Sequence, residues 1–255
     1  MRAAVEARLR AAGSVFASDE ADLLVSSART PAELESMVDR RIDGVPLEHI
    51  LGWAWFCGIR VCVTPGVFVP RARTELLVRE AAALADAPGT IVVDLCCGSG
   101  AIGVAIAAAC RGQIRLHATD IDPVSVECAR RNLEPIGGYV HQGDLFTALP
   151  GDLLKRVEVV AVNAPYVPTD AMSLLPPEAR LYEPRHALDG GVDGLDIMRR
   201  IVAEAPSWLA PGGHVVIETS ERQAAAATDV VARAGLIPRV VRDDDIDATV
   251  VVASV

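Results

Sequence analysis

The chain has 255 residues, 51% of them apolar and 23% charged, which is ordinary globular usage and long enough for one large domain or a catalytic domain with a small accessory one. This composition excludes a disordered or low-complexity chain. With 24 lysines and arginines against 34 aspartates and glutamates, the net charge of −10 argues against nonspecific nucleic-acid binding, which needs a basic face.

At the start of the chain we expect a helix and not a targeting or membrane segment. Residues 1–14 have charges within their apolar pattern and predict an amphipathic helix, not a signal peptide. No run of about 18 uncharged apolar residues occurs, so no membrane-spanning helix is expected. The six cysteines lie mostly in apolar runs, and no Cys/His cluster has zinc spacing. We therefore expect reduced thiols in a cytoplasmic protein without a metal.

The first part of the chain predicts helices and then a hairpin. Thr30 to Glu33 form a capping box with proline at the first helical position, for a helix that runs to about residue 44. Residues 46–52 predict a short helical turn. Aromatic and β-branched residues at 53–56 and 59–63 predict a hairpin. We expect a helical domain at 1–52, a hairpin linker at 53–75 and a larger domain at 76–255.

From about residue 75 the chain alternates between strands and helices. This alternation predicts an α/β fold with a doubly wound, mostly parallel sheet, in which ligands bind beyond the carboxyl ends of the strands. One helix is expected to stop before Pro206, and residues 211–213 are expected to form a turn before a strand. The expected strands are 91–95, 114–119, 139–142, 157–162, 214–219, 236–241 and 249–253.

A glycine-rich loop joins the first of these strands to a helix. Gly98, Gly100 and Gly103 match the G-x-G-x-x-G fingerprint of dinucleotide-binding proteins. Asp120 follows about 20 residues later at the end of the next strand, where a carboxylate can accept hydrogen bonds from both hydroxyls of an adenosine ribose. A tight turn without a ligand is the alternative interpretation.

The residues before the first glycine argue against a dinucleotide. Asp94 lies near the end of the strand, and two cysteines, Cys96 and Cys97, precede Gly98. This order resembles motif I of S-adenosylmethionine (AdoMet) methyltransferases. AdoMet carries an ammonium and a sulfonium instead of a pyrophosphate, so acidic residues at the loop are electrostatically sensible. The loop therefore favours AdoMet over NAD.

Two further segments follow strands. After the third strand, Asp144 is positioned to accept a hydrogen bond from an adenine amino group, and the Leu145 N–H to reach a ring nitrogen; a plain polar turn is the alternative.

After the fourth strand, residues 163–166 read Asn-Ala-Pro-Tyr and resemble the Asn-Pro-Pro-Tyr motif of amino-group methyltransferases. The Asn163 side-chain oxygen and the Ala164 carbonyl can accept from an NH₂ group and stabilise positive charge as its nitrogen is methylated.

The resemblance extends to one family of methyltransferases. Residues 41–52, 55–58, 65–75 and 183–195 resemble, in order, motifs of the HemK family of protein-(glutamine-N5) methyltransferases, and the Pro-Arg-x-x-Thr-Glu segment within 65–75 is the most specific of them. The resemblance covers most of residues 38–255. It implies a class I AdoMet-dependent methyltransferase, Rossmann-like with a seven-stranded, mostly parallel sheet, and a helical N-terminal domain that grips the protein substrate.

The same resemblance implies a reaction and a set of site residues. The best-known members methylate the glutamine of a Gly-Gly-Gln tripeptide in peptide-chain release factors, and others act on a ribosomal protein. On this basis we expect a protein substrate, no stable nucleic acid and a monomer or weak dimer. The catalytic residues implied are Asn163, Ala164, Pro165 and Tyr166. The cofactor residues are Asp94, Cys96, Cys97, Gly98, Ser99, Gly100, Asp120, Asp144, Leu145, Asn163 and Phe68, and the substrate residues are Pro70, Arg71, Asn163, Tyr166 and Glu183.

Some residues depart from the family pattern and leave alternatives open. Cys96 stands where the family usually has glycine, and Ala164 replaces a proline. Nucleic-acid amino-group methylation, on adenine N6 or guanine N2, uses the same Asn-x-Pro-Tyr geometry and is the first alternative. An inactive AdoMet-binding module is the second. The five histidines are scattered and form no visible triad.

Overall fold

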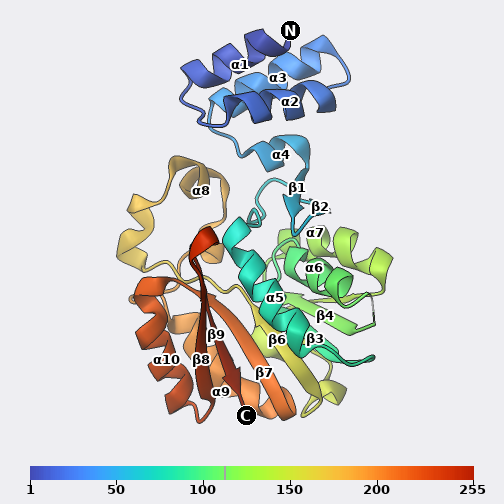
Figure 1. Ribbon diagram of the computed structural model, residues 1–255, viewed down its shortest axis with the longest axis vertical. Coiled ribbons are helices and arrows are strands. Elements are labelled where there is room, and N and C mark those ends of the chain that lie inside the picture. Colours follow the sequence, from blue (N-terminus) through green and yellow to red (C-terminus); the bar gives the residue numbers. More distant parts are fainter. Residues whose placement is uncertain (112) are drawn as a thin grey trace.

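The computed structural model describes residues 1–111 and 113–255, and it places a small helical bundle at one end of an α/β body (Figure 1). The bundle contains α1 (Arg2–Ala11), α2 (Ala17–Ser27), α3 (Pro31–Ile42) and the short α4 (Leu47–Leu51). Their apolar faces share one core that includes Leu9, Leu24 and Val38. The Thr30 hydroxyl accepts a hydrogen bond from the Glu33 N–H at 3.1 Å, which confirms the predicted cap of α3.

The predicted hairpin follows the bundle and packs on the body. Strands β1 (Trp53–Phe56) and β2 (Ile59–Cys62) are antiparallel, and Phe56 and Val61 are buried in the same core as one face of the large sheet. The Asn132 side chain accepts from the Cys62 N–H at 2.8 Å and donates to the Ser99 carbonyl at 2.8 Å. The Asn132 side chain therefore links the hairpin to the glycine loop.

The body is a twisted sheet between two layers of helices (Figure 1). Within the described residues the sheet has seven strands in the order β5-β4-β3-β6-β7-β9-β8; the first five are parallel and the last two antiparallel to their neighbours. The strands are β3 (Ile91–Leu95), β4 (Arg115–Asp120), β5 (Tyr139–Gln142), β6 (Val157–Val162), β7 (Leu209–Thr219), β8 (Ile237–Asp243) and β9 (Ala248–Ser254).

The helices pack on the sheet through two separate cores. One face of the sheet packs on α5 (Glu75–Leu84), α6 (Ala101–Ala109) and α7 (Pro123–Leu133), and the other face on α9 (Asp196–Trp208) and α10 (Ala224–Arg233). The central parallel strands β3 and β6 are almost wholly apolar and buried, as expected for strands covered on both faces. The short α8 (Pro177–Tyr182) lies near the bundle, beyond the sheet.

Two local predictions are wrong. Helix α9 does not stop before Pro206 but continues to Trp208, whose ring stacks on Phe146 with centroids 5.8 Å apart. A proline in the last turn removes only one helical hydrogen bond, and the packing of Trp208 offsets that loss. The expected turn at residues 211–213 is a bulge within β7, because Leu209 pairs with Val157 and His214 with Val159.

Within residues 1–111 and 113–255, none of the helices combines the length and the apolar character that crossing a membrane would require.

Candidate active site

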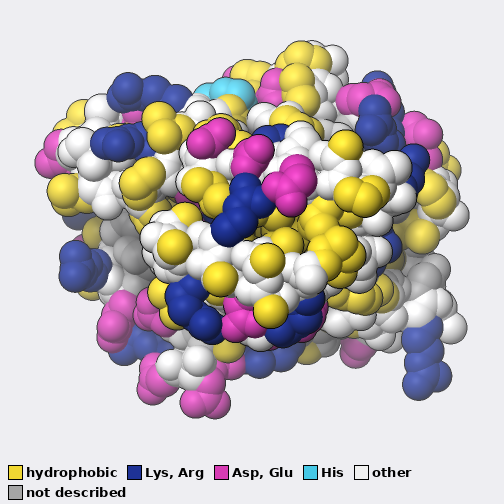
Figure 2. All heavy atoms as spheres, turned by 90° about the horizontal axis from the view of Figure 1, so that it is seen from above, with side chains coloured by type: hydrophobic (Ala, Val, Ile, Leu, Met, Phe, Trp, Pro, Cys, Tyr) yellow, Lys and Arg dark blue, Asp and Glu magenta, His cyan; other side chains and the backbone are white. Residues whose placement is uncertain are grey.

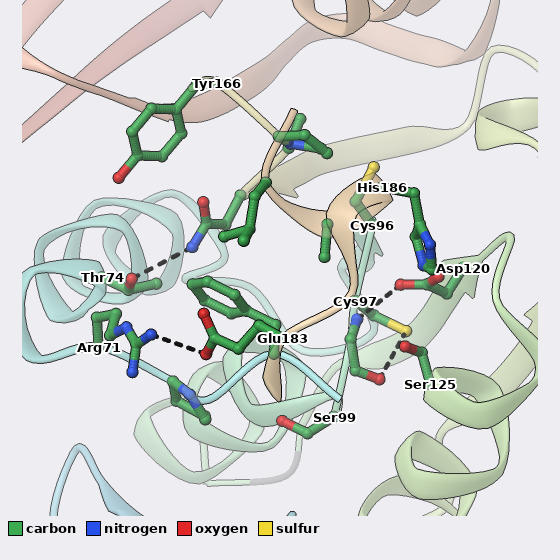
Figure 3. Close-up of a pocket in the computed structure, with 18 of the residues that line it drawn as sticks. Arg71, Thr74, Cys96, Cys97, Ser99, Asp120, Ser125, Tyr166, Glu183 and His186 are labelled. Carbon is green, nitrogen blue, oxygen red and sulfur yellow. Dashed lines mark hydrogen bonds and ion pairs between the residues drawn. The ribbon is translucent and has the colours of Figure 1, made fainter. Parts of the chain in front are cut away.

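A cavity of about 700 Å³ lies at the carboxyl ends of the parallel strands, where the sequence placed the three motifs. The glycine loop, the Asn-Ala-Pro-Tyr segment and the residues before α5 all contribute to it (Figure 3). The predicted site residues that line it are Phe68, Pro70, Arg71, Cys96, Cys97, Gly98, Ser99, Asp120, Asp144, Leu145, Asn163, Ala164, Pro165, Tyr166 and Glu183. Asp94 and Gly100 fall outside this lining.

Asp120 is held at the end of β4 by backbone donors. One carboxylate oxygen accepts from the Gly98 N–H at 2.8 Å, and the other from the Asp122 N–H at 2.9 Å. Each oxygen keeps a further lone pair for a ligand, since an ionised carboxylate has about four acceptor sites. Burial raises the pKa of Asp120, and the two N–H groups oppose that shift. This preorganised acceptor fits a ribose diol, so the residues present fit AdoMet.

Asp94 and Gly100 support the loop from behind. Asp94 is fully buried; one of its oxygens accepts from the Gly103 N–H at 2.9 Å, and the other has no hydrogen-bond partner among the described residues. Burial raises the pKa of Asp94 to about 8. A Cβ on Gly100, whose φ is +75°, would lie 2.9 Å from a methyl carbon of Leu133. Both residues shape the loop from outside the cavity.

Cys96, which departs from the family pattern, has a backbone conformation that glycine adopts more readily than other residues do. Cys96 has φ of +60°, in the left-handed region that L-residues with a Cβ adopt only at a cost. All six cysteines are unpaired in the described part of the chain. The family preference for glycine at this position therefore has a conformational reason, and Cys96 is accommodated under strain.

An ion pair lies among the residues that line the cavity. Asp144, the expected adenine acceptor, contacts the Arg200 guanidinium through Oδ2 at 2.6 Å, and both side chains are about half exposed. Leu145 is buried and has φ of +48°. Arg200 thus occupies one acceptor site of Asp144 at the rim, and the remaining acceptor sites of the carboxylate are available for an adenine amino group.

The Asn-Ala-Pro-Tyr segment follows β6, and its side chains are oriented by neighbours. The Asn163 Nδ2 donates to the Thr74 hydroxyl at 3.4 Å, and this turns Oδ1 the opposite way, as an acceptor. The Tyr166 hydroxyl donates to the Glu218 carboxylate at 3.3 Å. Burial, followed by the charge of Glu218, raises the pKa of Tyr166 to about 12, so the phenol is neutral. The segment presents acceptors beside an uncharged aromatic ring.

Two of the family motifs, the segment 65–75 and the loop 183–195, contact each other at the cavity. Glu183 accepts from the Val69 N–H at 3.0 Å and from Arg71 at 2.7 Å, and the Arg71 guanidinium lies over the Phe68 ring at 5.1 Å. The Glu183 side chain is only 1% exposed. Its contacts are therefore with its own chain: it fastens the segment 65–75 to the loop 183–195, while Arg71 remains one-third exposed at the cavity.

Several residues in the cavity or next to it carry no clear signal in the sequence. His186 lines the cavity near Asp120 (Figure 3), although the sequence grouped it with scattered histidines. Gln223 donates to the carbonyls of Tyr166 at 2.9 Å and Asp193 at 3.1 Å, while its only sequence signal was a capping box. Glu218 lies at the end of β7 without any motif.

Known proteins resemble the chain both in sequence and in structure. A family model described as "Methyltransferase small domain" matches residues 58–174. A "Release factor glutamine methyltransferase" of Geobacter sulfurreducens is 41% identical over 207 residues, covering 80% of this chain and 71% of that relative. One from Streptomyces coelicolor is 40% identical over 202 residues, covering 78% and 71%. The crystal structure of a methyltransferase from Pyrococcus furiosus has a TM-score of 0.57 at 16% identity over 77% of this chain and 88% of that one.

The structural likeness confirms the class I methyltransferase fold that the motifs implied, with its seven-stranded sheet. The sequence likeness is more specific, since it extends over about four-fifths of the chain at about 40% identity. It agrees with a site in which an acceptor for ribose and an Asn-x-Pro-Tyr segment line one cavity. The chain belongs to the family of release factor glutamine methyltransferases.

Proposed function

We propose that this protein methylates the side-chain amide nitrogen of a glutamine in a protein substrate, and that the substrate is a peptide-chain release factor. The observation that carries the proposal is the pairing, in one cavity, of the Asp120 carboxylate with the acceptors of Asn163 and Ala164. The relatives named above are release factor glutamine methyltransferases, which supports this choice of substrate.

AdoMet is the cofactor, and when bound it supplies an electrophilic methyl group on its sulfonium. The residues that would hold it are Asp120 for the ribose, the loop 96–99, and Asp144 with Leu145 for the adenine. The described lining has six carboxylates, two of them at these positions, against three arginines, and this acidic balance suits a cationic ligand. Phe68 contributes an apolar wall.

The residues of the site must orient the amide nitrogen of glutamine, which is a poor nucleophile. The lone pair of an amide nitrogen is delocalised into its carbonyl group. We expect the two N–H bonds of the glutamine to donate to Asn163 Oδ1 and to the Ala164 carbonyl, so that the lone pair faces the methyl group. As the nitrogen becomes positive its N–H groups become stronger donors, and these two contacts strengthen in the transition state. The ring of Tyr166 offers a flat apolar surface for the amide.

The helical bundle of residues 1–52 is proposed to recognise the protein substrate. Its junction with the body includes a partly buried ion pair: Arg41 donates to Glu20 within the bundle at 2.8 Å and lies 3.6 Å from Glu178 of α8. Seen from the bundle end, acidic and basic side chains alternate on the surface without merging into a basic patch (Figure 2). That face is better suited to a protein than to a nucleic acid.

We further propose a cytoplasmic protein that is a monomer or weak dimer and holds no stable nucleic acid. The net charge of −10 and the six unpaired cysteines of the described chain support this proposal. Sedimentation at several concentrations would test the oligomeric state.

The experiment that tests the function uses AdoMet with an isotopically labelled methyl group. The purified protein is incubated with a release-factor domain that carries Gly-Gly-Gln, and with the same domain in which that glutamine is replaced by alanine. Mass spectrometry should place one methyl group on the glutamine side chain of the first domain only. Label on nucleic acid in a lysate, with none on the release factor, would overturn the proposal.

A further inference from the structure

Arg73 lines the cavity beside the segment that is expected to hold the glutamine. It occupies the second variable position of the Pro-Arg-x-x-Thr-Glu segment, so its side chain is a feature of this chain and not of the family pattern. Its guanidinium carbon lies 6.0 Å from the centre of the Tyr166 ring. The next residue, Thr74, accepts from Asn163. Arg73 therefore borders the part of the cavity that the glutamine should enter.

The guanidinium of Arg73 is anchored on one side and open on the other. Its Nε lies 3.4 Å from Oε1 of Glu218, whose side chain is only 2% exposed. The Arg73 side chain itself is 43% exposed. Among the described residues this ion pair is its closest polar contact, and none of them accepts a hydrogen bond from its two terminal nitrogens. The N–H groups of these nitrogens are therefore available to a ligand in the cavity.

Arg71, two residues earlier, has a similar arrangement. Its guanidinium lies 5.1 Å from the centre of the Phe68 ring, and its Nη2 lies 2.7 Å from the buried Glu183 carboxylate (Figure 3). Each of the two arginines is thus placed against an aromatic ring of the cavity and anchored by an almost fully buried carboxylate. Such anchoring restricts the rotamers of a long side chain, so a ligand that binds these donors orders less of the protein.

The acceptor that suits Arg73 is a main-chain carbonyl of the substrate. In Gly-Gly-Gln the two residues before the glutamine have no side chains, so their peptide groups are the polar groups by which an enzyme can recognise them. The described lining contains six carboxylates against three arginines, and this balance opposes an acidic side chain of the substrate but not a neutral carbonyl. A charged donor also makes a stronger hydrogen bond to a carbonyl than a neutral donor does.

We propose that Arg73 is a substrate-binding residue whose terminal N–H groups donate to a main-chain carbonyl of the residues that precede the methylated glutamine. This inference rests on the proposed function, because it concerns the peptide that carries that glutamine. Arg73 contributes binding and takes no part in the methyl transfer. Its contact exists in the ground state and in the transition state alike, so its removal should raise KM for the protein substrate and leave kcat nearly unchanged.

Arg73→Met tests the proposal by removing the donors while keeping an unbranched side chain. KM for a release-factor domain that carries Gly-Gly-Gln should rise by about 10–100-fold, the scale for loss of one hydrogen bond from a charged donor, with kcat and AdoMet affinity near the wild-type values. Arg79→Met is the matched control and should leave KM unchanged, because Arg79 is an exposed arginine that pairs with Asp243 and lies outside the described lining. An unchanged KM in Arg73→Met, with or without a fall in kcat, would overturn the proposal.

A second comparison separates substrate binding from a purely structural role beside Glu218. Arg73→Met leaves the buried Glu218 without its arginine, whereas a Glu218→Gln background has no carboxylate to pair with. If Arg73 binds the substrate, Arg73→Met raises KM by the same factor in both backgrounds. If Arg73 only pairs with Glu218, the effect disappears in Glu218→Gln, and the proposal is wrong. Poor folding of Arg73→Met alone leaves the test intact, because Glu218→Gln and the double variant can still be compared.

Changes in the substrate distinguish a carbonyl from a carboxylate. In a domain whose acidic residues next to the tripeptide are replaced by their amides, Arg73→Met should still raise KM. Disappearance of the effect would show that Arg73 binds a side-chain carboxylate and would overturn the main-chain assignment. In all of these outcomes the wild type still methylates the glutamine, so the proposed function stands. A wild-type protein that places no methyl group on glutamine overturns the proposed function, and the role of Arg73 with it.

Discussion

The carboxylate of Asp120 accepts a hydrogen bond from the backbone N–H of Gly98 at 2.8 Å, so the end of β4 holds the glycine loop that follows β3. This contact joins two motifs that are 22 residues apart in the sequence. Because the second oxygen is held by the Asp122 N–H at 2.9 Å, the carboxylate cannot rotate freely. The same carboxylate therefore both provides the expected acceptor for the cofactor and holds the glycine loop in place.

Asp120→Ala should weaken cofactor binding by two effects. It removes two charge-assisted hydrogen bonds to the ribose, worth about 1.5–3 kcal/mol each, and it releases the Gly98 N–H. We expect at least a hundredfold loss of AdoMet affinity by titration calorimetry. Asp120→Asn, which keeps one acceptor oxygen, should lose less. Unchanged affinity in Asp120→Ala would mean that the ribose lies elsewhere, and binding of NAD in place of AdoMet by the wild type would contradict the assigned cofactor.

Asn163→Ala should separate binding from chemistry. The substitution leaves the cofactor loop untouched, so AdoMet affinity should change little. Methyl transfer should fall by about 10²–10³-fold, the scale for loss of one preorganised hydrogen-bonding group at a developing charge. Single-turnover transfer to a Gly-Gly-Gln domain measures this. Asn163→Asp should be less harmful because an acceptor remains, and a wild-type rate in Asn163→Ala would show that the glutamine is held by other groups.

Cys96→Gly should be tolerated and should stabilise the loop. With φ of +60°, Cys96 occupies a conformation that costs an L-residue about 1 kcal/mol and costs glycine nothing. The melting temperature and AdoMet affinity should stay the same or rise. Cys97→Gly is the matched control: Cys97 is buried in the apolar core and is not among the residues with positive φ, so glycine there should destabilise. Loss of AdoMet binding in Cys96→Gly would reveal a task for the thiol.

Asp94 should make stability depend on pH. Burial raises its pKa from 3.8 to about 8, so between these values the folded protein keeps a proton that the unfolded chain releases. The free energy of unfolding should fall as pH rises through this window, by at most about 1.4 kcal/mol per pH unit, and level off above it. Asp94→Asn stays neutral and can still accept from the Gly103 N–H. Urea unfolding from pH 4 to 9 should give a flatter profile for Asp94→Asn than for wild type.

The sequence by itself determined the order of elements and the position of the site. Apolar β-branched runs such as 157–162 and caps such as Thr30 act within a few residues, so they can be read along the chain. Because parallel strands end at the same edge, the residues after them could be expected together, and Asp120, Asn163 and Tyr166 do line one cavity. Family motifs added Arg71 and Glu183.

Only the tertiary structure decided which residues support those that face the ligand. Asn163 and Thr74 are 89 residues apart, Tyr166 and Glu218 52, and Val69 and Glu183 114, yet each pair is joined by a hydrogen bond. Asp94 looks in sequence like a cofactor residue and lies fully buried behind the loop. A side chain's chemistry can be read from its type, but its partner, burial and protonation depend on what the fold packs against it, and those neighbours come from distant strands and loops.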